Sequence, residues 1–414
     1  MRRISTYMPS DDMQHHLRLR EFKMNELQNK MAEQTRIKEL RDDPLAAAHS
    51  TKYQSHITRL ERYLDNTGKL QGRLQVAEQY LQSGNELLHR VRELAIQGAN
   101  GTYTADQRRM MATEVNSYLS ELVEIANARS GDGTAMFGGD ALAANPFRTL
   151  SGSVPGSNGL VLTDVMYIGG PARSQAEVSE GSLIETTFAG GDIFWAEQHA
   201  IMTDVNAATY SVDDAATLLI DGVNIDLKAG DNVYSIIAKI NESDAAVRAS
   251  LDPVQNSLVL RSTYPHQLRI EDGAGSTVLQ DLGVVTGRDE PPHNLAPEAR
   301  VSGGSVFDMI MYVRDQLWNG DVIDVSGAGL RGLDQAQHNL LASLADLGTR
   351  SERLQIIESR ISYEIPEMRR RNSEEVDLDL SEAILDLKML EYAHQAALQT
   401  AGRVLRQTLL DFLR

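Results

Sequence analysis

The sequence has no cysteine among its 414 residues. This absence excludes disulfide bonds, zinc–thiolate sites and thiol nucleophiles. The chain also has no run of 18 apolar residues, the length that a membrane-spanning helix needs. The opening residues, MRRISTYMPSDDMQHH, carry two arginines with no apolar stretch after them. We therefore expect no membrane partner and no secretory signal peptide, and export by another route if the protein leaves the cell.

Basic side chains are too few to balance the acidic ones. Lysine and arginine number 40 against 58 aspartate and glutamate residues, so the net charge at pH 7 is −18. The imbalance is concentrated in residues 140–300, which hold 9 basic and 22 acidic side chains. Such a segment repels phosphates, so we predict no nucleic-acid partner and a solvated acidic surface. With 42% hydrophobic residues, the chain still has enough apolar surface to bury globular cores.

The clearest pattern present is a heptad seam in the last forty residues. Apolar or small residues recur at alternating gaps of four and three, which keeps one stripe of a helix facing a partner helix. The seam consists of Val376, Leu380, Ala383, Leu387, Leu390, His394, Ala397, Ala401 and Val404. Asp379 and Ser381 mark a polar helix start, and a start nearer Glu374 fits equally well. Such a helix needs another long helix, from this chain or from another copy.

The first forty residues carry the same spacing. Their seam contains one arginine and consists of Met13, Leu17, Arg20, Met24, Leu27 and Met31. The pattern breaks before Pro44, which has no backbone N–H and fits the first position of a new helix. Asp42 or Asp43 is the expected N-cap of that helix, which runs to about Gly98.

Four inner seams predict a helical bundle. Thr104 and Gln107 fit a capping box at the start of the second of these helices. A loop is expected at WNGDVIDVSGAGLRG, residues 318–332, before the last long helices. The four seams are Leu70, Leu74, Ala77, Leu81, Gly84, Leu88, Val91 and Ala95; Met111, Val115, Tyr118, Leu122 and Ile125; Val306, Met309, Ile310, Val313 and Leu317; and Leu333, Ala336, Leu340, Leu344 and Leu347.

The middle of the chain changes character, because helical seams disappear and alternating strand patterns replace them. TLLIDGVNIDL places two such runs around Asp221-Gly222, which predicts a β-hairpin. A short helix with Val233, Ile236, Ile237 and Ile240 on one face follows, and then three short strands. Residues 217–285 thus form a compact ββαβββ unit. GGDIFWAEQ, residues 190–198, predicts one more apolar element.

We predict an α+β fold in which long N- and C-terminal helices form an antiparallel coiled-coil-like bundle around a central β-rich insert. The expected divisions are an N-terminal assembly helix, N-terminal bundle helices, the β-rich insert domain, C-terminal bundle helices and a C-terminal assembly helix. Their bounds are residues 1–44, 45–139, 140–300, 301–374 and 375–414.

The two extreme helices lack a third long element to complete their cores, so we predict that their stripes contact other subunits. His394 fits two roles there, a proton switch and an interface histidine with satisfied hydrogen bonds. The predicted subunit-interface residues are Met13, Leu17, Met24, Leu27, Met31, Leu380, Leu387, Leu390, His394, Ala397, Ala401, Val404 and Leu405.

Residues that would carry chemistry are sparse. The sequence has no metalloprotease signature and no phosphate-binding loop ending in Gly-Lys-Ser/Thr. The carboxylate pairs Asp42-Asp43 and Asp213-Asp214 are adjacent, so they do not flank a substrate as hydrolysis requires. We therefore expect no enzyme, no catalytic or metal site and no cofactor.

Several stretches resemble the bacterial flagellin superfamily, and within it most closely the hook-associated protein 3 group of hook–filament junction proteins. They are MRRIS at the start, RIKELRDDPLAAA at 36–48, NGTYTADQRRMMATEVNSYLSELVEIANA at 100–128 and GDGTAMFGGD at 131–140. LLIDGVNIDLKAGDNVYSIIAKIN, with the closing QDLGVV, is similar to the small β-rich insert of that superfamily. Thr134 and Ala135 depart from its pattern, which usually has larger apolar or aromatic residues there.

The resemblance implies a structural, extracellular component of the bacterial flagellum, used in motility and self-assembled through its terminal helices. The expected role is a junction adaptor between hook and filament; the alternative is filament-forming flagellin. The implied partners are neighbouring copies in a ring, a hook-associated protein on the hook side, flagellin on the filament side and a flagellar export chaperone. In a spirochaete host, the implied location is a periplasmic flagellum. From a different functional class, the alternative is a cell-surface adhesin built on a coiled-coil stalk.

Overall fold

The computed structural model describes residues 8–39, 41–141, 145–157, 159–288 and 291–407, with side chains on the first and last helices only from Asp12 and up to Gly402. The chain forms two compact units. The terminal unit consists of Met1–Asp65 and Glu358–Arg414, and the body unit consists of Asn66–Ile357. The five-part division expected from the sequence stays a prediction. The fold class is as expected, with long terminal helices and a β-rich middle.

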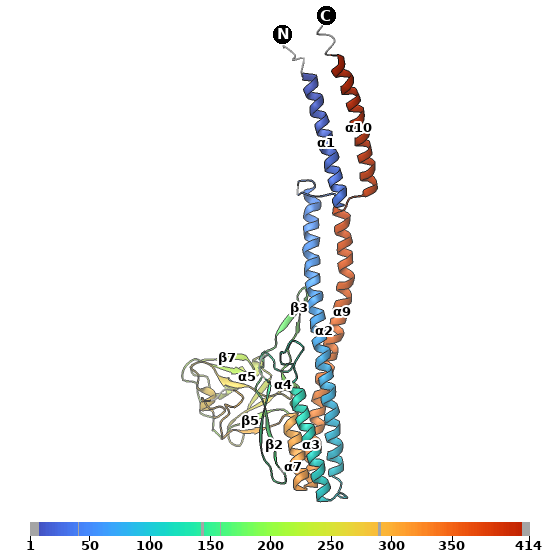
Figure 1. The fold of residues 1–414 in the computed structure, drawn as a ribbon. Coiled ribbons are helices and arrows are strands. Elements are labelled where there is room, and N and C mark those ends of the chain that lie inside the picture. The colour runs from blue at the N-terminus through green and yellow to red at the C-terminus, as the bar shows by residue number, and fades with distance from the viewer. Residues whose placement is uncertain (1–7, 40, 142–144, 158, 289–290, 408–414) are drawn as a thin grey trace. The chain divides into compact units, whose positions relative to one another are not determined.

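In the terminal unit, α1 (Met8–Glu33) and α10 (Leu380–Gln407) lie side by side (Figure 1). They are antiparallel, because Thr35 pairs with Asp377 while Arg20 contacts Ala393. The unit also contains the beginning of α2 (Pro44–Gly98) and the end of α9 (Leu330–Val376).

Capping residues set the helix starts of this unit. The Asp43 carboxylate accepts a hydrogen bond from the Ala46 backbone N–H at 3.1 Å, as expected of an N-cap before Pro44. At α10, the Asp379 carboxylate accepts from the backbone N–H groups of Ser381 and Glu382. The polar start at Asp379 is therefore confirmed, whereas the expected seam is divided, because Val376 ends α9 before α10 begins.

The body unit contains a bundle of α2, α3 (Ala105–Ala126), α7 (Val306–Asn319) and α9. The helices approach closely at Gly84, where an added Cβ atom would lie 3.2 Å from the Leu122 side chain of α3. The apolar residues of the predicted seam from Leu70 to Ala95 are all buried, so that prediction is confirmed.

The predicted seam of α3 is partly wrong. The helix begins as expected, with the reciprocal capping box of Thr104 and Gln107. Met111, Tyr118 and Ile125 are only half-buried, however. The buried positions are Ala112, Val115, Leu119, Leu122, Val123 and Ala126. A helix that contacts several neighbours buries a wider face than one seam, and small alanines then occupy the closest approach.

The loop expected at residues 318–332 is also wrong. A short helix, α8 (Val322–Asp324), is followed by a π-helical turn at Val325–Gly329, and α9 begins at Leu330. Asp321 starts this segment, since its carboxylate accepts hydrogen bonds from the N–H groups of Ile323 and Asp324. Local capping and the buried side chain of Val325 therefore outweigh the low helix propensity of the glycines.

Among the described residues, the β-rich part of the body unit holds four small antiparallel sheets. Two are hairpins, β1–β2 and β3–β4; the others have the orders β10-β6-β7 and β11-β5-β9-β8. The strands are β1 (Phe147–Ser153), β2 (Leu160–Tyr167), β3 (Gln175–Ser179), β4 (Ser182–Glu185), β5 (Ala200–Met202), β6 (Ala216–Ile220), β7 (Val223–Leu227), β8 (Val247–Leu251), β9 (Leu258–Ser262), β10 (Ile270–Asp272) and β11 (Arg300–Ser302). The short helices are α4 (Gly190–Ile193), α5 (Val233–Glu242) and α6 (Val278–Asp281).

The expected order ββαβββ appears as β6, β7, α5, β8, β9 and β10. Asp221 and Gly222 both have positive φ angles, 50° and 82°, which is the geometry of a tight hairpin turn. Unlike the single unit expected, the strands are divided between two sheets, and one sheet takes β5 and β11 from outside residues 217–285.

Two buried histidines hold the loop after β9. The His266 ring contacts two acceptors, the Asp221 carboxylate at 3.2 Å and the Tyr264 carbonyl at 2.9 Å. Burial on its own lowers the pKa of His266, but the hydrogen bond to Asp221 and its charge raise that pKa above the ordinary value. His199 instead accepts a hydrogen bond from the Leu268 N–H, and burial lowers its pKa to about 4.

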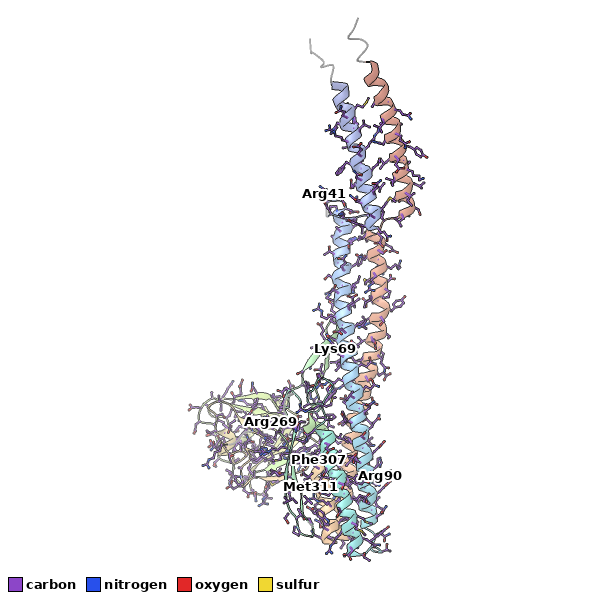
Figure 2. The ribbon with its side chains drawn as sticks, in the orientation of Figure 1. Arg41, Lys69, Arg90, Arg269, Phe307 and Met311 are labelled. Atoms are coloured by element: carbon purple, nitrogen blue, oxygen red, sulfur yellow. The ribbon has the colours of Figure 1, made fainter. Side chains whose placement is uncertain are left out.

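Aromatic rings and one buried cation join the β-rich part to the helices of the body unit. Phe307 of α7, labelled with Met311 in Figure 2, stacks on Phe194 with ring centroids 5.7 Å apart. Arg314 is completely buried; its guanidinium donates to the Leu162 carbonyl at 2.7 Å and to Asn116 at 2.9 Å. These contacts fix β2 against α3 and α7.

Candidate assembly surface

The predicted interface residues lie along the contact between α1 and α10. Ala401 is buried and Leu380 is exposed. The half-buried ones are Met13, Leu17, Met24, Leu27, Met31, Leu387, Leu390, His394 and Ala397. The side chains of Val404 and Leu405 are outside the described residues. The two stripes therefore cover each other in part within one chain, and their contact with other subunits stays a prediction.

The helix pair is loosely packed. A groove of about 570 Å³ opens beside Leu27 and Leu390, and another of about 700 Å³ opens beside Leu17 and Ala397. Two helices alone cannot surround a side chain, so the seam remains half-open to solvent. This explains why none of the five predicted residues of α1 is fully buried.

A second apolar stripe runs along an exposed side of α10, and its Met389 also borders the groove beside Leu27 and Leu390. Leu385, Met389 and Tyr392 follow each other at gaps of four and three, each two residues after a seam position. Their exposed fractions are 65%, 62% and 71%. We call these three residues the outer stripe. On α1, Leu19 and Phe22 are also exposed, and each lies two residues after a position of the α1 seam.

Sequence reasoning missed the outer stripe, although its signal was present. The same helical period that identifies the seam also places Leu385, Met389 and Tyr392 in a second stripe of α10. A helix with two apolar stripes has two surfaces that gain from burial. Only one neighbour, α1, is described within this chain.

The connector, residues 34–39 and 41–43 with 377–379, joins the helices of the terminal unit. Arg36 donates its backbone N–H to the Val376 carbonyl at 2.7 Å, and Leu378 donates to the Gln34 carbonyl at 3.0 Å. The Arg36 guanidinium reaches the Glu375 carbonyl and the Asp43 carboxylate. Arg41, labelled in Figure 2, pairs with Glu39.

Hydrogen bonds also shift the acids of the connector. The backbone N–H of Ala46, and then the guanidinium of Arg36, lower the pKa of Asp43. The backbone N–H groups of Lys38 and Glu39 lower the pKa of Asp42. Both carboxylates therefore stay charged at neutral pH and accept these hydrogen bonds.

A polar layer interrupts the α1–α10 seam. The Arg20 guanidinium donates to the Ala393 carbonyl at 2.8 Å. His394 Nε2 lies 3.8 Å from Glu21, and its buried Nδ1 has no hydrogen-bond partner among the described residues. Neither predicted role of His394 is tested by this geometry, so both stay predictions.

In the described part of the chain, no three histidine, aspartate or glutamate side chains gather as metal ligands. No described helix combines the length and the apolar character needed to cross a bilayer.

Two family models match the chain. Residues 4–141 match the bacterial flagellin N-terminal helical region, and residues 210–263 match the flagellin hook IN motif. These two segments of the chain are therefore similar to bacterial flagellins. The first flagellin model spans α1, the first part of the connector, α2 and α3, and the second spans β6 to β9.

Curated flagellin-family relatives match parts of the chain. The flagellar filament 31.3 kDa core protein of Treponema maltophilum is 32% identical over 125 residues, which is 30% of this chain and 44% of the relative. The flagellar filament 30.7 kDa core protein of the same organism is 29% identical over 214 residues, 51% of this chain and 70% of the relative. The chain thus spans less than half of the first relative.

A solved structure is also similar. The flagellar hook associated protein-3 from Legionella pneumophila is 17% identical, with a TM-score of 0.47. The match covers 78% of this chain and 98% of that chain.

Proposed function

We propose that this protein is a structural subunit of the bacterial flagellum that self-assembles through its terminal unit. The observation that carries the proposal is the outer stripe, which stays exposed after the seam of α10 has packed on α1. Three large apolar side chains in a row on one helix lose favourable burial unless a neighbour covers them. A second copy of the chain supplies such a neighbour without any further component.

Within the flagellum, we place the protein at the junction between hook and filament. The support is the resemblance of its N-terminal and glycine-rich motifs to the hook-associated protein 3 group. In this role it forms a ring of neighbouring copies, with a hook-associated protein on one side and flagellin on the other. An export chaperone that covers the last helix before assembly completes the set of proposed partners. The location is extracellular, or periplasmic in a spirochaete.

Filament-forming flagellin is the second candidate. The Treponema relatives are flagellar filament core proteins, and this similarity favours it. A structural rather than catalytic role is common to both candidates.

Assembly of the pure full-length protein separates the two. After addition of ammonium sulfate, negative-stain electron microscopy and light scattering report the products. We expect monomers or short rings that add to isolated hook ends. Long filaments from this protein alone would overturn the junction role and establish the second candidate.

Removal of residues 1–40 tests the assembly surface itself. The truncated protein should keep the thermal unfolding transition of the body unit, because none of the deleted residues belongs to it. It should also fail to assemble. Cooperative loss of the body transition on truncation would contradict a separate assembly unit.

A further inference from the structure

The sequence contains three Asn-Gly dipeptides, at residues 100–101, 158–159 and 319–320. Asparagine loses its side-chain amide most readily before glycine, because glycine has no side chain to shield its backbone nitrogen. Asn158 is outside the described residues. The other two dipeptides both lie where a helix of the bundle ends, and both asparagines are exposed. Exposure alone therefore does not separate them.

Hydrogen bonding protects the dipeptide at the end of α7. Asn319 is the last residue of that helix, and Gly320 donates its backbone N–H to the Gln316 carbonyl. Within a helix, each N–H points along the axis toward the preceding turn, whereas the side chains point outward. The Gly320 nitrogen must break its hydrogen bond before it can reach the side-chain amide of Asn319.

The dipeptide after α2 has the opposite arrangement. The helix ends at Gly98, and residues 99–104 form the turn that leads into α3 (Figure 1). Within the described ranges, the Gly101 N–H donates to no acceptor. The side-chain oxygen of Asn100 accepts a hydrogen bond from the Thr102 N–H at 3.3 Å. This contact folds the amide of Asn100 back toward the Gly101 backbone, so the two reacting groups are neighbours.

We propose that Asn100 is a site of spontaneous deamidation in the folded protein, whereas Asn319 is protected. The Gly101 backbone nitrogen loses its proton to water and bonds to Cγ of Asn100, and ammonia leaves. The resulting five-membered succinimide adds one water molecule at either carbonyl and opens to aspartate or isoaspartate. The net reaction consumes one water and releases one ammonia.

The products change the turn between α2 and α3 in two ways. Both add one negative charge at neutral pH, and isoaspartate also adds one methylene group to the backbone. The helices on either side keep their own ends, because α2 stops at Gly98 and the capping box of Thr104 and Gln107 starts α3. The modification therefore accumulates as the folded protein ages.

Peptide mapping of the full-length protein tests the proposal. The protein is incubated at pH 8 and 37 °C, digested with trypsin at intervals and analysed by mass spectrometry. One digest reports both sites, so each is a control for the other. We expect Asn100 to react about tenfold faster than Asn319 or more, because the reaction at Asn319 must first break a helical hydrogen bond. In concentrated urea, which removes that hydrogen bond, the two rates should become similar.

A matched pair of glycine variants tests the role of the Gly101 nitrogen. Among the described residues, a Cβ atom added at Gly101 or at Gly131 would meet no heavy atom within 4 Å, so both substitutions fit the fold. Gly101→Ala shields the attacking nitrogen and should slow the reaction at Asn100 several-fold. Gly131→Ala alters an exposed glycine that does not follow asparagine and should change neither rate.

Two results would overturn the proposal. One is equal deamidation of Asn100 and Asn319 in the folded protein. The other is an unchanged rate at Asn100 in Gly101→Ala. The reaction needs neither assembly nor a partner, so failure of the proposed flagellar function leaves this test intact.

Discussion

The two units use the same heptad spacing with different outcomes. In the body unit, the α2 seam from Leu70 to Ala95 is buried throughout, and Leu81 has no exposed surface. In the terminal unit, the seam residues from Met13 to Met31 are half-buried, although their spacing is equally regular. The difference is the number of neighbours, since α2 contacts both α3 and α9 near Gly84.

This comparison separates two properties that sequence periodicity combines. The period identifies the face of a helix that seeks a partner. How deeply that face is buried depends on how many elements surround it, which the period does not contain. A regular seam with half-buried residues marks a helix whose environment is incomplete within one chain.

The largest expected effect contrasts one leucine in each unit. Leu81→Ala in the body should lower the free energy of unfolding by about 2–5 kcal/mol, because it opens a cavity in a closed core. Leu387→Ala in α10 should cost less than about 1 kcal/mol, because solvent already reaches this side chain. Urea denaturation followed by circular dichroism measures both. Equal losses would contradict the contrast between a closed and an open seam.

The two buried histidines make the stability of the body unit depend on pH in opposite directions. The raised pKa of His266 stabilises the fold below the ordinary histidine pKa, and this contribution is lost as pH rises through the folded value. The lowered pKa of His199 stabilises the fold above the ordinary value, and this contribution is lost as pH falls toward 4. Body stability should therefore be greatest near pH 6.5, with an acid loss of about 3 kcal/mol.

Thermal unfolding between pH 4 and 9 measures this profile, and matched variants divide it. His199→Asn keeps an acceptor for the Leu268 N–H without titrating in this range, so it should flatten the acid side. His266→Gln keeps a donor toward Asp221 and should flatten the alkaline side. A profile that neither substitution changes would rule out both histidines as its cause.

Removal of a helix cap should have a smaller effect on stability, and this effect should differ between the two units. Thr104→Ala removes the capping box of α3 and should lower the unfolding free energy of the body by about 1 kcal/mol. Asp43→Ala removes a cap in the terminal unit and should leave the unfolding transition of the body unit unchanged. Instead, hydrogen exchange should quicken at the first turn of α2. A lower body transition in Asp43→Ala would show that the units unfold together.

Much of the helical fold could be predicted because its signals are local. The caps at Asp43, Thr104 and Asp379 and the turn at Asp221-Gly222 depend on residues next to one another. The strands β1 and β2 could not be predicted in the same way. Their sequences mix serine, threonine and glycine with few alternating apolar residues, and their pairing depends on contacts with α3 and α7.

The candidate surface was predicted only in part. Periodicity identified the stripe of α10 that packs on α1, from Leu380 to Ala401, and left the outer stripe unnoticed. The hydrogen bond from Arg20 to the Ala393 carbonyl joins residues 373 positions apart, so no local pattern reveals it.

The outer stripe provides the most direct test of the central claim. Met389→Glu with Tyr392→Glu should leave the unfolding free energy within about 0.5 kcal/mol of wild type, because both side chains are already exposed. Lys388→Glu changes the net charge by the same two units outside the stripe and is the matched control. Sedimentation after assembly with ammonium sulfate is the measurement. We predict that wild type and control assemble while the double variant stays monomeric. Assembly of the double variant at the wild-type level would contradict the account.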